Sequence, residues 1–525
     1  MKKNYLDITR VSQAAIRYGV SNRAAAAIAT ATLASAKDAN FLKKNTDIFV
    51  DHNKIKRSKT KLMKEIRGRA EKVAMNDNIQ CIFFDGRKDL TKYMREEEDG
   101  KLHPSEKKEE HYSVCSEPGG KYQFHFTNNS EERVDTAAEQ IAGNIYEWVV
   151  NHDVGDYLVA IGADSTNLNT GWKGGVIHYL EHKLDKKLMW IICALHTNEL
   201  PLRHLMIQLD GKTTSKNNFS GSIGKLIGKA TSFKVKDSIV KIEFPNAIIE
   251  LDSEVVKSLS DDQKYLYKIT HAINAGVFPE NLKSKEIGPH SHARWLNFAN
   301  RICLLWCSEI VLSVEETYNL QLLVEFIVGV YAPLWFEIKV KWKWTEGPNH
   351  ILKQLKLLCH QRLKVKDIVM PYVLSSSWNA HSKNVLQTLL CSLEKTERQF
   401  AVETILKLRG DLKYGNTSVR SRKHHIHNEN AESLFDLIDW SLDVHEPLLT
   451  CLLSKDELLK YNDIPMYVPC FPVHGQAIER CVQEVTRASQ SVFGKDRRDG
   501  FIRATLAHRE IMPVNQSKKD LFKLI

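Results

Sequence analysis

Two aspartates stand where apolar runs end, and their side chains could hold a divalent cation. The run Ile79–Phe84 is followed by Asp85, and the run Tyr157–Gly162 is followed shortly by Asp164. If the two runs are neighbouring strands, both carboxylates lie at one edge of the sheet and offer the oxygen ligands that Mg²⁺ prefers. Two such ions about 4 Å apart activate an attacking oxygen and stabilise a leaving one in phosphoryl transfer. The alternative is that each aspartate only shapes a turn, the commoner role of Asp at a strand end.

The segments around these aspartates predict a mixed sheet. Runs typical of strands occur at five places: Ile79–Phe84, His111–Cys115, Lys121–Phe126, Tyr157–Gly162 and Leu188–Leu195. Helical spacing occupies Thr136–Val150 and Gly175–Leu184, whereas the charged segment Lys92–Glu110 is expected to be a flexible loop. Three strands before the first helix predict an antiparallel meander, and the strands reached through helices are expected to add in parallel.

Most of the remaining chain shows helical periodicity. Residues 1–75 are expected to be helical, either as a hairpin that packs or as a helix-turn-helix, with Ser21 capping an alanine-rich helix. A large all-helical block covers about 255–460, and a strand at Met466–Phe471 and a helix from about Gly475 to Val492 follow it. The predicted class is therefore α/β, with a mixed sheet that is interrupted by a large all-α insertion.

Composition indicates a globular chain with a modest basic excess. Of the 525 residues, 43% are hydrophobic and 26% are charged, which excludes collagen-like, low-complexity and wholly disordered chains. The net charge of +10 fits a nucleic-acid partner, provided that the positive charge is clustered. The ten cysteines include no CxxC pair, so a zinc finger is not expected.

The sequence also predicts where the protein works. No membrane partner is expected, because the most apolar stretch, Phe326–Phe336, is too short to span a bilayer and the first residues contain no apolar signal core. We therefore expect a reducing compartment, the nucleus, with the cytoplasm as the alternative. The basic run from Lys54 to Lys61 suits a nuclear import signal, or it is a solvated helix face.

Four motifs resemble, in the same order, those of the hAT superfamily of DDE/D transposases and of proteins derived from them. The string Ile161–Gly171 resembles the segment around the second catalytic aspartate, and Cys193–His196 is similar to the Cys-x-x-His signature that comes after it. The pair Arg294-Trp295 looks like the element that opens the helical insertion, and His474–Arg480 resembles the motif that carries the final acid. The resemblance covers about residues 80–525.

This resemblance implies an RNase H-like fold and a metal-dependent DNA transposase. Asp85, Asp164 and Glu479 would be the catalytic acids and the ligands of Mg²⁺ or Mn²⁺. In the family's scheme, water attacks a phosphodiester first and the freed 3′ hydroxyl then attacks a second phosphate. Cys193 and His196 are expected to be structural residues beside this site.

Contacts to DNA are expected from five side chains: Arg294, Trp295, Arg422, Lys423 and Arg480. Trp295 could stack on an unpaired base, and an aromatic residue at this place in the family is linked to holding a flipped base. The alternative is that Trp295 anchors its helix to the core. Arg422 and Lys423 lie in a basic stretch that suits phosphate contact, and Arg480 follows the last predicted acid.

The expected domains are a helical N-terminal region (1–75), the first part of an RNase H-like core (76–215), a mostly helical insertion (216–460) and the last part of the core (461–525). The family commonly begins with a zinc finger, yet the first cysteine is Cys81, and Gly475 and Gln476 stand where the family has serines. Two alternatives therefore stay open: a catalytically inactive, transposase-derived DNA- or protein-binding protein, and an RNase H-like nuclease without strand transfer. A homo-oligomer is also open.

Overall fold

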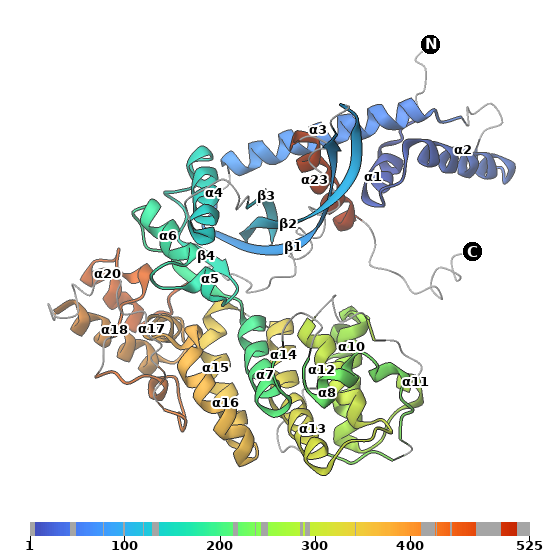
Figure 1. Ribbon diagram of the computed structural model, residues 1–525. Helices are drawn as coiled ribbons and strands as arrows, with labels where there is room; N and C mark the ends of the chain where they lie inside the picture. Colours follow the sequence, from blue (N-terminus) through green and yellow to red (C-terminus); the bar gives the residue numbers. More distant parts are fainter. Residues whose placement is uncertain are drawn as a thin grey trace. The chain divides into compact units, whose positions relative to one another are not determined.

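The computed structural model describes most of the chain (Figure 1). The described residues are 6–42, 49–76, 78–97, 100–118, 120–128, 136–213, 219–236, 238–242, 250–283, 287–288, 294–341, 343–410, 426, 428–441, 444–468 and 495–511. The chain divides into two compact units, of which unit 1 comprises Met1–Ala163, Lys173–Trp190 and Gly475–Ile525. Unit 2 comprises Asp164–Trp172 and Ile191–His474. The four domain boundaries expected from the sequence stay predictions.

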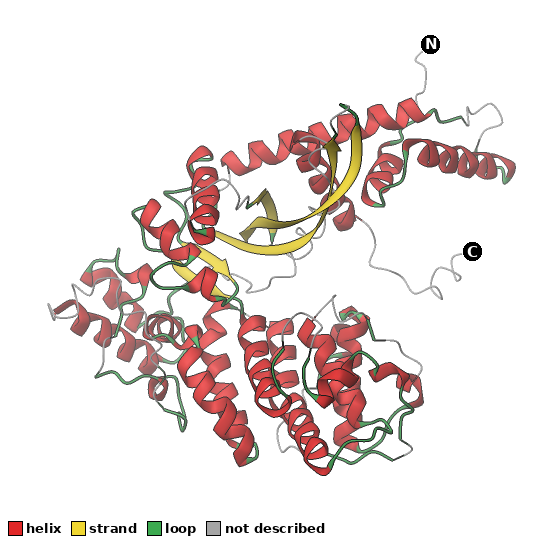
Figure 2. Cartoon of the chain, viewed as in Figure 1, coloured by secondary structure: helices red, strands yellow, loops and turns green. Residues whose placement is uncertain are grey.

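A mixed five-stranded sheet forms the centre of unit 1 (Figure 2). The strands are β1 (Cys81–Glu96), β2 (Leu102–Glu117), β3 (Lys121–Thr127), β4 (Ala160–Ala163) and β5 (Met189–Ile192), in the spatial order β3-β2-β1-β4-β5. β1 pairs with β2 and β2 with β3 in antiparallel fashion, whereas β1 pairs with β4 in parallel. The predicted meander and the parallel addition of β4 are confirmed, and so is the α/β class.

The prediction of a flexible loop over Lys92–Glu110 is wrong. These residues belong to a long hairpin in which β1 and β2 stay in register from Cys81↔Glu117 to Glu96↔Leu102. The pairing sets opposite charges and polar partners across the two strands, such as Lys88 opposite Glu110. Cross-strand pairs of this kind stabilise a ladder although neither strand is apolar. In its buried middle, the Thr91 hydroxyl and the His111 Nε2 lie 2.6 Å apart.

Two helices of unit 1 connect the later strands. α4 (Ala137–Asn151) begins with a capping box, in which Thr136 and Glu139 bond each other's backbone N–H groups. α6 (Val176–Lys183) precedes β5 and carries the buried Glu181, which accepts hydrogen bonds from Leu188 N at 3.1 Å and Trp190 Nε1 at 2.9 Å. Both helices confirm the sequence prediction, and Glu181 fixes the start of β5.

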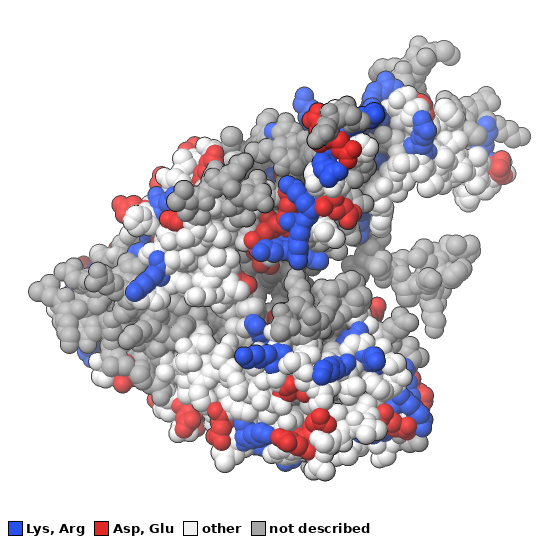
Figure 3. All heavy atoms as spheres, viewed as in Figure 1, with Lys and Arg blue, Asp and Glu red and all other residues white. Residues whose placement is uncertain are grey.

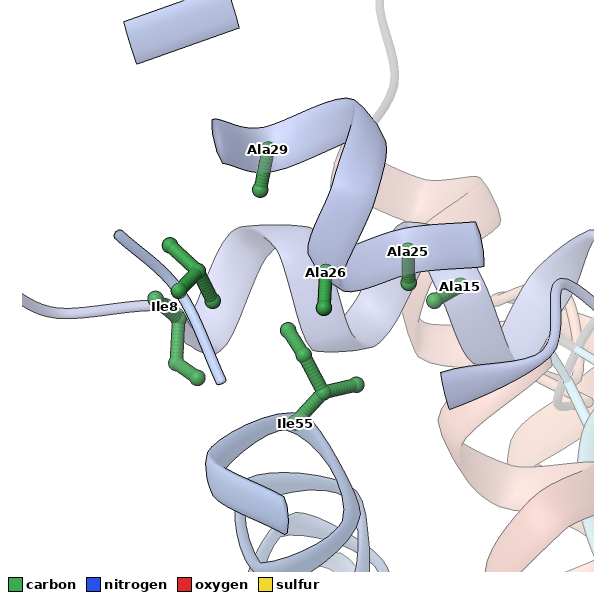
Figure 4. Close-up of a cluster of buried hydrophobic side chains, with 7 residues drawn as sticks. Ile8, Ala15, Ala25, Ala26, Ala29 and Ile55 are labelled. Atoms are coloured by element: carbon green, nitrogen blue, oxygen red, sulfur yellow. The ribbon is translucent and has the colours of Figure 1, made fainter. Parts of the chain in front are cut away.

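Three helices near the start of the chain pack around a small apolar cluster. α1 (Thr9–Arg17), α2 (Asn22–Asp38) and α3 (His52–Asn76) surround buried alanines and isoleucines, with Ala26 of α2 facing Ile55 of α3 (Figure 4). Ser21 caps α2 by accepting a hydrogen bond from Ala24 N at 3.1 Å. The predicted helical character of this region and the cap at Ser21 are confirmed. The structure leaves both alternatives, packing hairpin and helix-turn-helix, open.

A helix from the end of the chain joins unit 1. α23 (Lys495–Ile511) packs against α1 and α3, where Ala504 joins Ile16 and Leu62 in a second apolar cluster. The Arg503 guanidinium of α23 donates hydrogen bonds to the backbone oxygens of Tyr122, at 3.1 Å, and Gln123. These hydrogen bonds hold α23 against β3.

The described part of unit 2 is mainly helical, apart from the end of β5 and isolated β-bridges. Its α-helices are α5 (Asn167–Thr170), α7 (Ala194–Asp210), α8 (Ser222–Ile227), α9 (Ser253–Ser258), α10 (Asp261–Ala275), α11 (Glu280–Lys283), α12 (Arg294–Trp306), α13 (Val314–Phe326), α14 (Ala332–Lys341), α15 (Gly347–Cys359), α16 (Leu363–Ser376), α17 (Ser382–Leu390), α18 (Lys395–Gly410) and α20 (Lys455–Leu459). The predicted helical block is confirmed. Of the predicted strand at 466–471, the described residues Met466–Val468 form no strand, and the helix predicted from about Gly475 to Val492 lies outside the described residues.

One helix of unit 2 is longer and more apolar than the sequence suggested. α13, a π-helical turn (Ile327–Tyr331) and α14 run on as one helix, of which the 27 residues Val314–Val340 are long and apolar enough to cross a membrane. However, 89% of its most apolar window is buried within the protein. Asn198 of α7 donates a hydrogen bond to Tyr331 O at 3.1 Å, deep in this packing. This helix therefore has the surroundings of a core helix.

Candidate functional site

The two predicted aspartates follow the paired parts of neighbouring parallel strands. The register between β1 and β4 sets Cys81 opposite Ala160, Ile82 opposite Ile161 and Phe83 opposite Gly162. Asp85 comes two residues after Phe83 in the sequence, and Asp164 comes two residues after Gly162. Gly162 permits this close pairing, since an added Cβ would overlap the ring of Phe83. The adjacency of the two strands, on which the sequence prediction depended, is confirmed.

Asp85 is half-buried and sits in a tightly packed part of the hairpin. Its Oδ1 accepts a hydrogen bond from Gly86 N at 2.8 Å. Gly86 has no space for a side chain, because the Tyr112 ring from β2 lies against it. That ring is itself stacked on Phe126 of β3 at 5.3 Å between centroids. The backbone on both sides of Asp85 is therefore fixed by packing, which holds its carboxylate in one place.

Asp164 is also half-buried and lies in the turn before a short helix, α5. Its Oδ1 accepts hydrogen bonds from Thr166 N at 3.0 Å, Thr166 Oγ1 at 2.7 Å and Asn169 Nδ2 at 2.7 Å. This is the turn-forming role that Asp commonly has at a strand end. All of these bonds to described residues use Oδ1, so Oδ2 keeps its lone pairs for another ligand. The turn role and a ligand role are therefore compatible.

The third predicted acid cannot be placed. Glu479 and Arg480 lie outside the described residues, as do Arg422 and Lys423 of the basic stretch. Within the described part of the chain, no three His, Cys, Asp or Glu side chains gather as a metal site. The prediction that Asp85 closes its strand is wrong, because β1 continues to Glu96. The carboxylates of Asp85 and Asp164 fit Mg²⁺ or Mn²⁺ in donor chemistry, since these ions take oxygen ligands and keep several waters. A complete site needs ligands beyond Asp85 and Asp164.

Cys193 and His196 lie at the start of a helix instead of in a strand. The predicted strand over Leu188–Leu195 ends at Ile192, and Cys193 is the N-cap of α7. Its carbonyl oxygen accepts hydrogen bonds from Thr197 N at 3.0 Å and Thr197 Oγ1 at 3.1 Å. His196 is half-buried in the first turn of α7. The apolar run misled the strand prediction, since periodicity cannot separate a buried strand from the start of a buried helix.

Trp295 is a core residue of unit 2 in this structure. It follows Arg294 at the start of α12, and its side chain is only 5% exposed. Its ring packs edge-to-face on Phe298 at 5.1 Å between centroids. This burial favours the alternative in which Trp295 anchors its helix to the core. Stacking on a base stays a prediction that would require the ring to leave this packing.

A cavity that the sequence did not reveal lies between α1 and α2. It measures about 370 Å³ and is lined mainly by alanine, valine, leucine and isoleucine side chains. Among the described residues that line it, the one carboxylate is that of Asp7. Asp7 already accepts hydrogen bonds from Thr9 N and Thr9 Oγ1, which lower the pKa of that carboxyl. The cavity therefore offers an apolar surface and no set of groups for acid–base chemistry.

Comparison with known proteins adds little to this geometry. No family model matches the chain, and no curated protein is similar to it. Among solved structures, a chain described as "Drosophila P element transposase strand transfer complex" is similar over 97% of this chain and 93% of that chain, with 12% identity and a TM-score of 0.30. At this TM-score the likeness carries no argument about fold or function.

Proposed function

We propose that the protein is a transposase-like DNA enzyme that cleaves phosphodiester bonds with the help of Mg²⁺ or Mn²⁺. The observation that carries this proposal is the parallel pairing of β1 with β4. The parallel register ends at Phe83↔Gly162, and Asp85 and Asp164 each come two residues later in the sequence. Carboxylates from adjacent strands can supply part of the ligand set for two-metal phosphoryl transfer.

In this proposal each acid has a defined role. Asp85 and Asp164 hold the metal, and Glu479 contributes the third carboxylate. The metal, when bound, supplies charge that activates water and stabilises the leaving oxygen. Hydrogen bonds from Thr166 and Asn169 to Asp164 Oδ1 orient this carboxylate before the substrate arrives. Positioning of this kind lowers the barrier without a covalent enzyme intermediate.

The finer parts of the proposal concern family, substrate and location. The order β3-β2-β1-β4-β5, with a helical block after β5, supports an RNase H-like core with an all-α insertion. The hAT type is proposed from the four motifs between Ile161 and Arg480, and the proposed place of action is the nucleus. Arg422, Lys423, Arg480 and Arg294 are the proposed phosphate contacts, and strand transfer by a freed 3′ hydroxyl is the proposed second step.

The test is metal-dependent cleavage by the full chain and its Asp164→Asn variant. Asparagine keeps the Oδ1 acceptor for Thr166 and Asn169, so the fold should survive while the metal ligand is lost. Cleavage of labelled duplex DNA in Mg²⁺ should disappear in this variant. The matched control is Asp156→Asn, an exposed aspartate before β4, which should cleave like the unchanged chain. Equal cleavage by both variants removes Asp164 from the mechanism.

A second candidate is a catalytically inactive, transposase-derived binding protein. The three hydrogen bonds at Asp164 Oδ1 favour it, since they give this residue a complete structural role without metal. It predicts DNA binding that is independent of metal, with no cleavage by the unchanged chain. A nuclease of the same fold without strand transfer would give hydrolysis products but no joined product. One assay that follows both cleavage and joining separates the three.

A further inference from the structure

The positive charge of the chain is concentrated on one helix, α3. Its 25 residues contain nine Lys and Arg against two Glu, a net charge of +7, while the whole chain has +10. The remaining 500 residues are therefore close to neutral as a set. A field that acts on polyanions depends on clustering of this kind more than on total charge.

Packing decides which face of α3 is exposed. Ile55 and Leu62 are buried, and Ile66 packs beside Leu62 in the apolar cluster that α3 shares with α1 and α23. Residues on the opposite side of the helix are spaced at i, i+4 and i+7, which places them in one row. That row is Arg57, Lys61 and Lys64, and its flank is Lys56; all four side chains are exposed. In Figure 3, Lys and Arg atoms stand at the upper edge, where Figure 1 places α3.

One lysine of α3 fixes the helix in place. Lys59 Nζ donates a hydrogen bond to Val20 O in the turn between α1 and α2, at 2.8 Å. Burial lowers the pKa of this ammonium from its usual value. This contact, together with buried Ile55 and Leu62, sets the rotation of α3 about its axis. The row of cations on the other side is therefore presented by a fixed helix.

The exposed cations are little neutralised by the protein itself. Among the described residues, the row makes one ion pair, Lys61 with Glu65 at 3.7 Å, and both side chains are largely in solvent. An exposed pair at successive turns is weak and holds neither partner firmly. Lys56 and Lys64 have no ion pair with any described residue. The row can therefore exchange its counterions for another anion.

We propose that this basic face of α3, formed by Lys56, Arg57, Lys61 and Lys64, binds the phosphate backbone of nucleic acid without reading its sequence. The row spans roughly 10 Å along the helix, from the rise of about 1.5 Å per residue, which matches a run of closely spaced phosphates. Duplex DNA carries one charge per about 1.7 Å of axis and releases counterions when lysines and arginines replace them. The guanidinium and ammonium groups supply those contacts, and no base edge is required.

An anionic membrane fits this helix less well. Helices that lie on membranes bury an apolar face among the lipids. The apolar face of α3 is already covered by α1, α2 and α23. Among the side chains of α3 that the structure describes, no large hydrophobic one is exposed. Nucleic acid needs only the charges, so it is the partner that the structure favours.

This proposal shares its nucleic-acid partner with the proposed function but uses neither Asp85 nor Asp164. The experiment compares the full chain with a variant in which four residues are replaced: Lys56→Gln, Arg57→Gln, Lys61→Gln and Lys64→Gln. Glutamine is a good helix former, so α3 should persist, and circular dichroism checks this. Affinity for a duplex of random sequence and for single-stranded RNA is measured by fluorescence anisotropy between about 50 and 200 mM KCl, a range in which backbone binding is strongly salt-dependent.

The expected result is a loss of affinity of about tenfold or more, with a shallower dependence on salt. For every phosphate that the variant no longer neutralises, the slope of log K against log salt should fall by about 0.9 for duplex DNA and about 0.7 for single strands. The matched control removes the same charge from the β1–β2 hairpin: Lys88→Gln, Lys101→Gln, Lys107→Gln and Lys108→Gln. This control should keep most of the affinity and the slope.

Three results would overturn the proposal. The first is an unchanged affinity and slope in the α3 variant. The second is an equal loss in the hairpin control, which would mean that only net charge matters. The third is unchanged nucleic-acid binding in the α3 variant together with loss of binding to phosphatidylserine vesicles or of nuclear import. A protein that binds through α3 but never cleaves DNA would refute the proposed enzyme and support this surface.

Discussion

The β1–β2 hairpin and helix α3 are two highly charged segments of unit 1, and they carry charge in opposite ways. From Arg87 to Glu110 the hairpin has seven Lys and Arg against eight acidic residues, whereas α3 has nine against two. The hairpin pairs its charges within itself, as in Lys107 with Glu109 at 2.5 Å and Arg95 with Glu97 at 2.6 Å. Figure 3 shows red and blue atoms interleaved where Figure 1 places this hairpin.

The charges of the hairpin interact with one another within the fold, whereas those of α3 remain available to a binding partner. In the hairpin, charges of both signs lie close together and partly neutralise one another, and β1 and β2 pair over sixteen residues each. In α3, like charges face solvent and gain nothing from one another. The base of the hairpin contains Asp85, a proposed metal ligand, whereas α3 contains the proposed binding surface for the phosphate backbone of nucleic acid. Chemistry and binding should therefore be separable by mutation.

The largest expected effect is on cleavage. Replacing Asp85 by Asn should lower Mg²⁺-dependent cleavage by at least about 10³-fold, the upper range for removing one group that stabilises a transition state. Binding of DNA should be unchanged, because the α3 face is intact. Cleavage rates under single-turnover conditions and anisotropy on the same sample measure the two quantities. A parallel loss of binding would show that the two regions do not act separately.

A smaller effect is expected on the stability of the hairpin. His111→Leu removes the partner of the Thr91 hydroxyl, and both residues are buried. Leaving a buried polar group unpaired costs about 1–3 kcal/mol. Urea unfolding should therefore show this loss, while nucleic-acid affinity at low temperature stays the same.

The double variant Thr91→Val/His111→Leu is the control for that measurement. It removes both polar partners and leaves neither unpaired. Its loss in free energy of unfolding should therefore be smaller than the sum of the losses in the two single variants. Strict additivity would mean that the hydrogen bond between Thr91 and His111 contributes nothing to the hairpin.

The smallest effect is expected at Lys59, which distinguishes one lysine of α3 from its neighbours. Lys59→Met removes the hydrogen bond to Val20 O, a loss of about 1 kcal/mol. The affinity for DNA should change by less than about twofold, because this ammonium is turned toward the turn after α1 and away from the row. A loss of DNA affinity as large as that caused by Lys61→Gln would mean that only the number of cations on α3 matters, and not the face on which they lie.

Much of the fold could be predicted from the sequence where local signals agree. The helix after Thr136 was found from its apolar spacing, and the capping box of Thr136 and Glu139 explains why it begins there. The strand at Lys121 is observed as β3 with nearly the predicted bounds. The outer half of the hairpin was missed, because its stability depends on which charge lies opposite which. That pairing is a property of two strands together and is absent from either one alone.

The candidate site could be predicted only in part, for a similar reason. Asp85 and Asp164 are visible in the sequence because each comes just after an apolar run, although β1 continues beyond Asp85 to Glu96. Glu479 stands about three hundred residues further along the chain, outside the described residues, and no local signal in the sequence tells where its side chain lies. The basic run from Lys54 to Lys61 was visible in the sequence, but which of its side chains share an exposed face depends on how α3 packs.

The most direct test of the proposed metal site is a crystal structure of the full chain grown with Mn²⁺, with the metal located by anomalous scattering. We predict manganese bound by carboxylate oxygens of both Asp85 and Asp164 at about 2.0–2.3 Å, with Glu479 completing the set. Manganese bound elsewhere, or Asp85 and Asp164 on separate surfaces with no shared ion, would contradict the proposed enzyme and leave a nucleic-acid-binding protein.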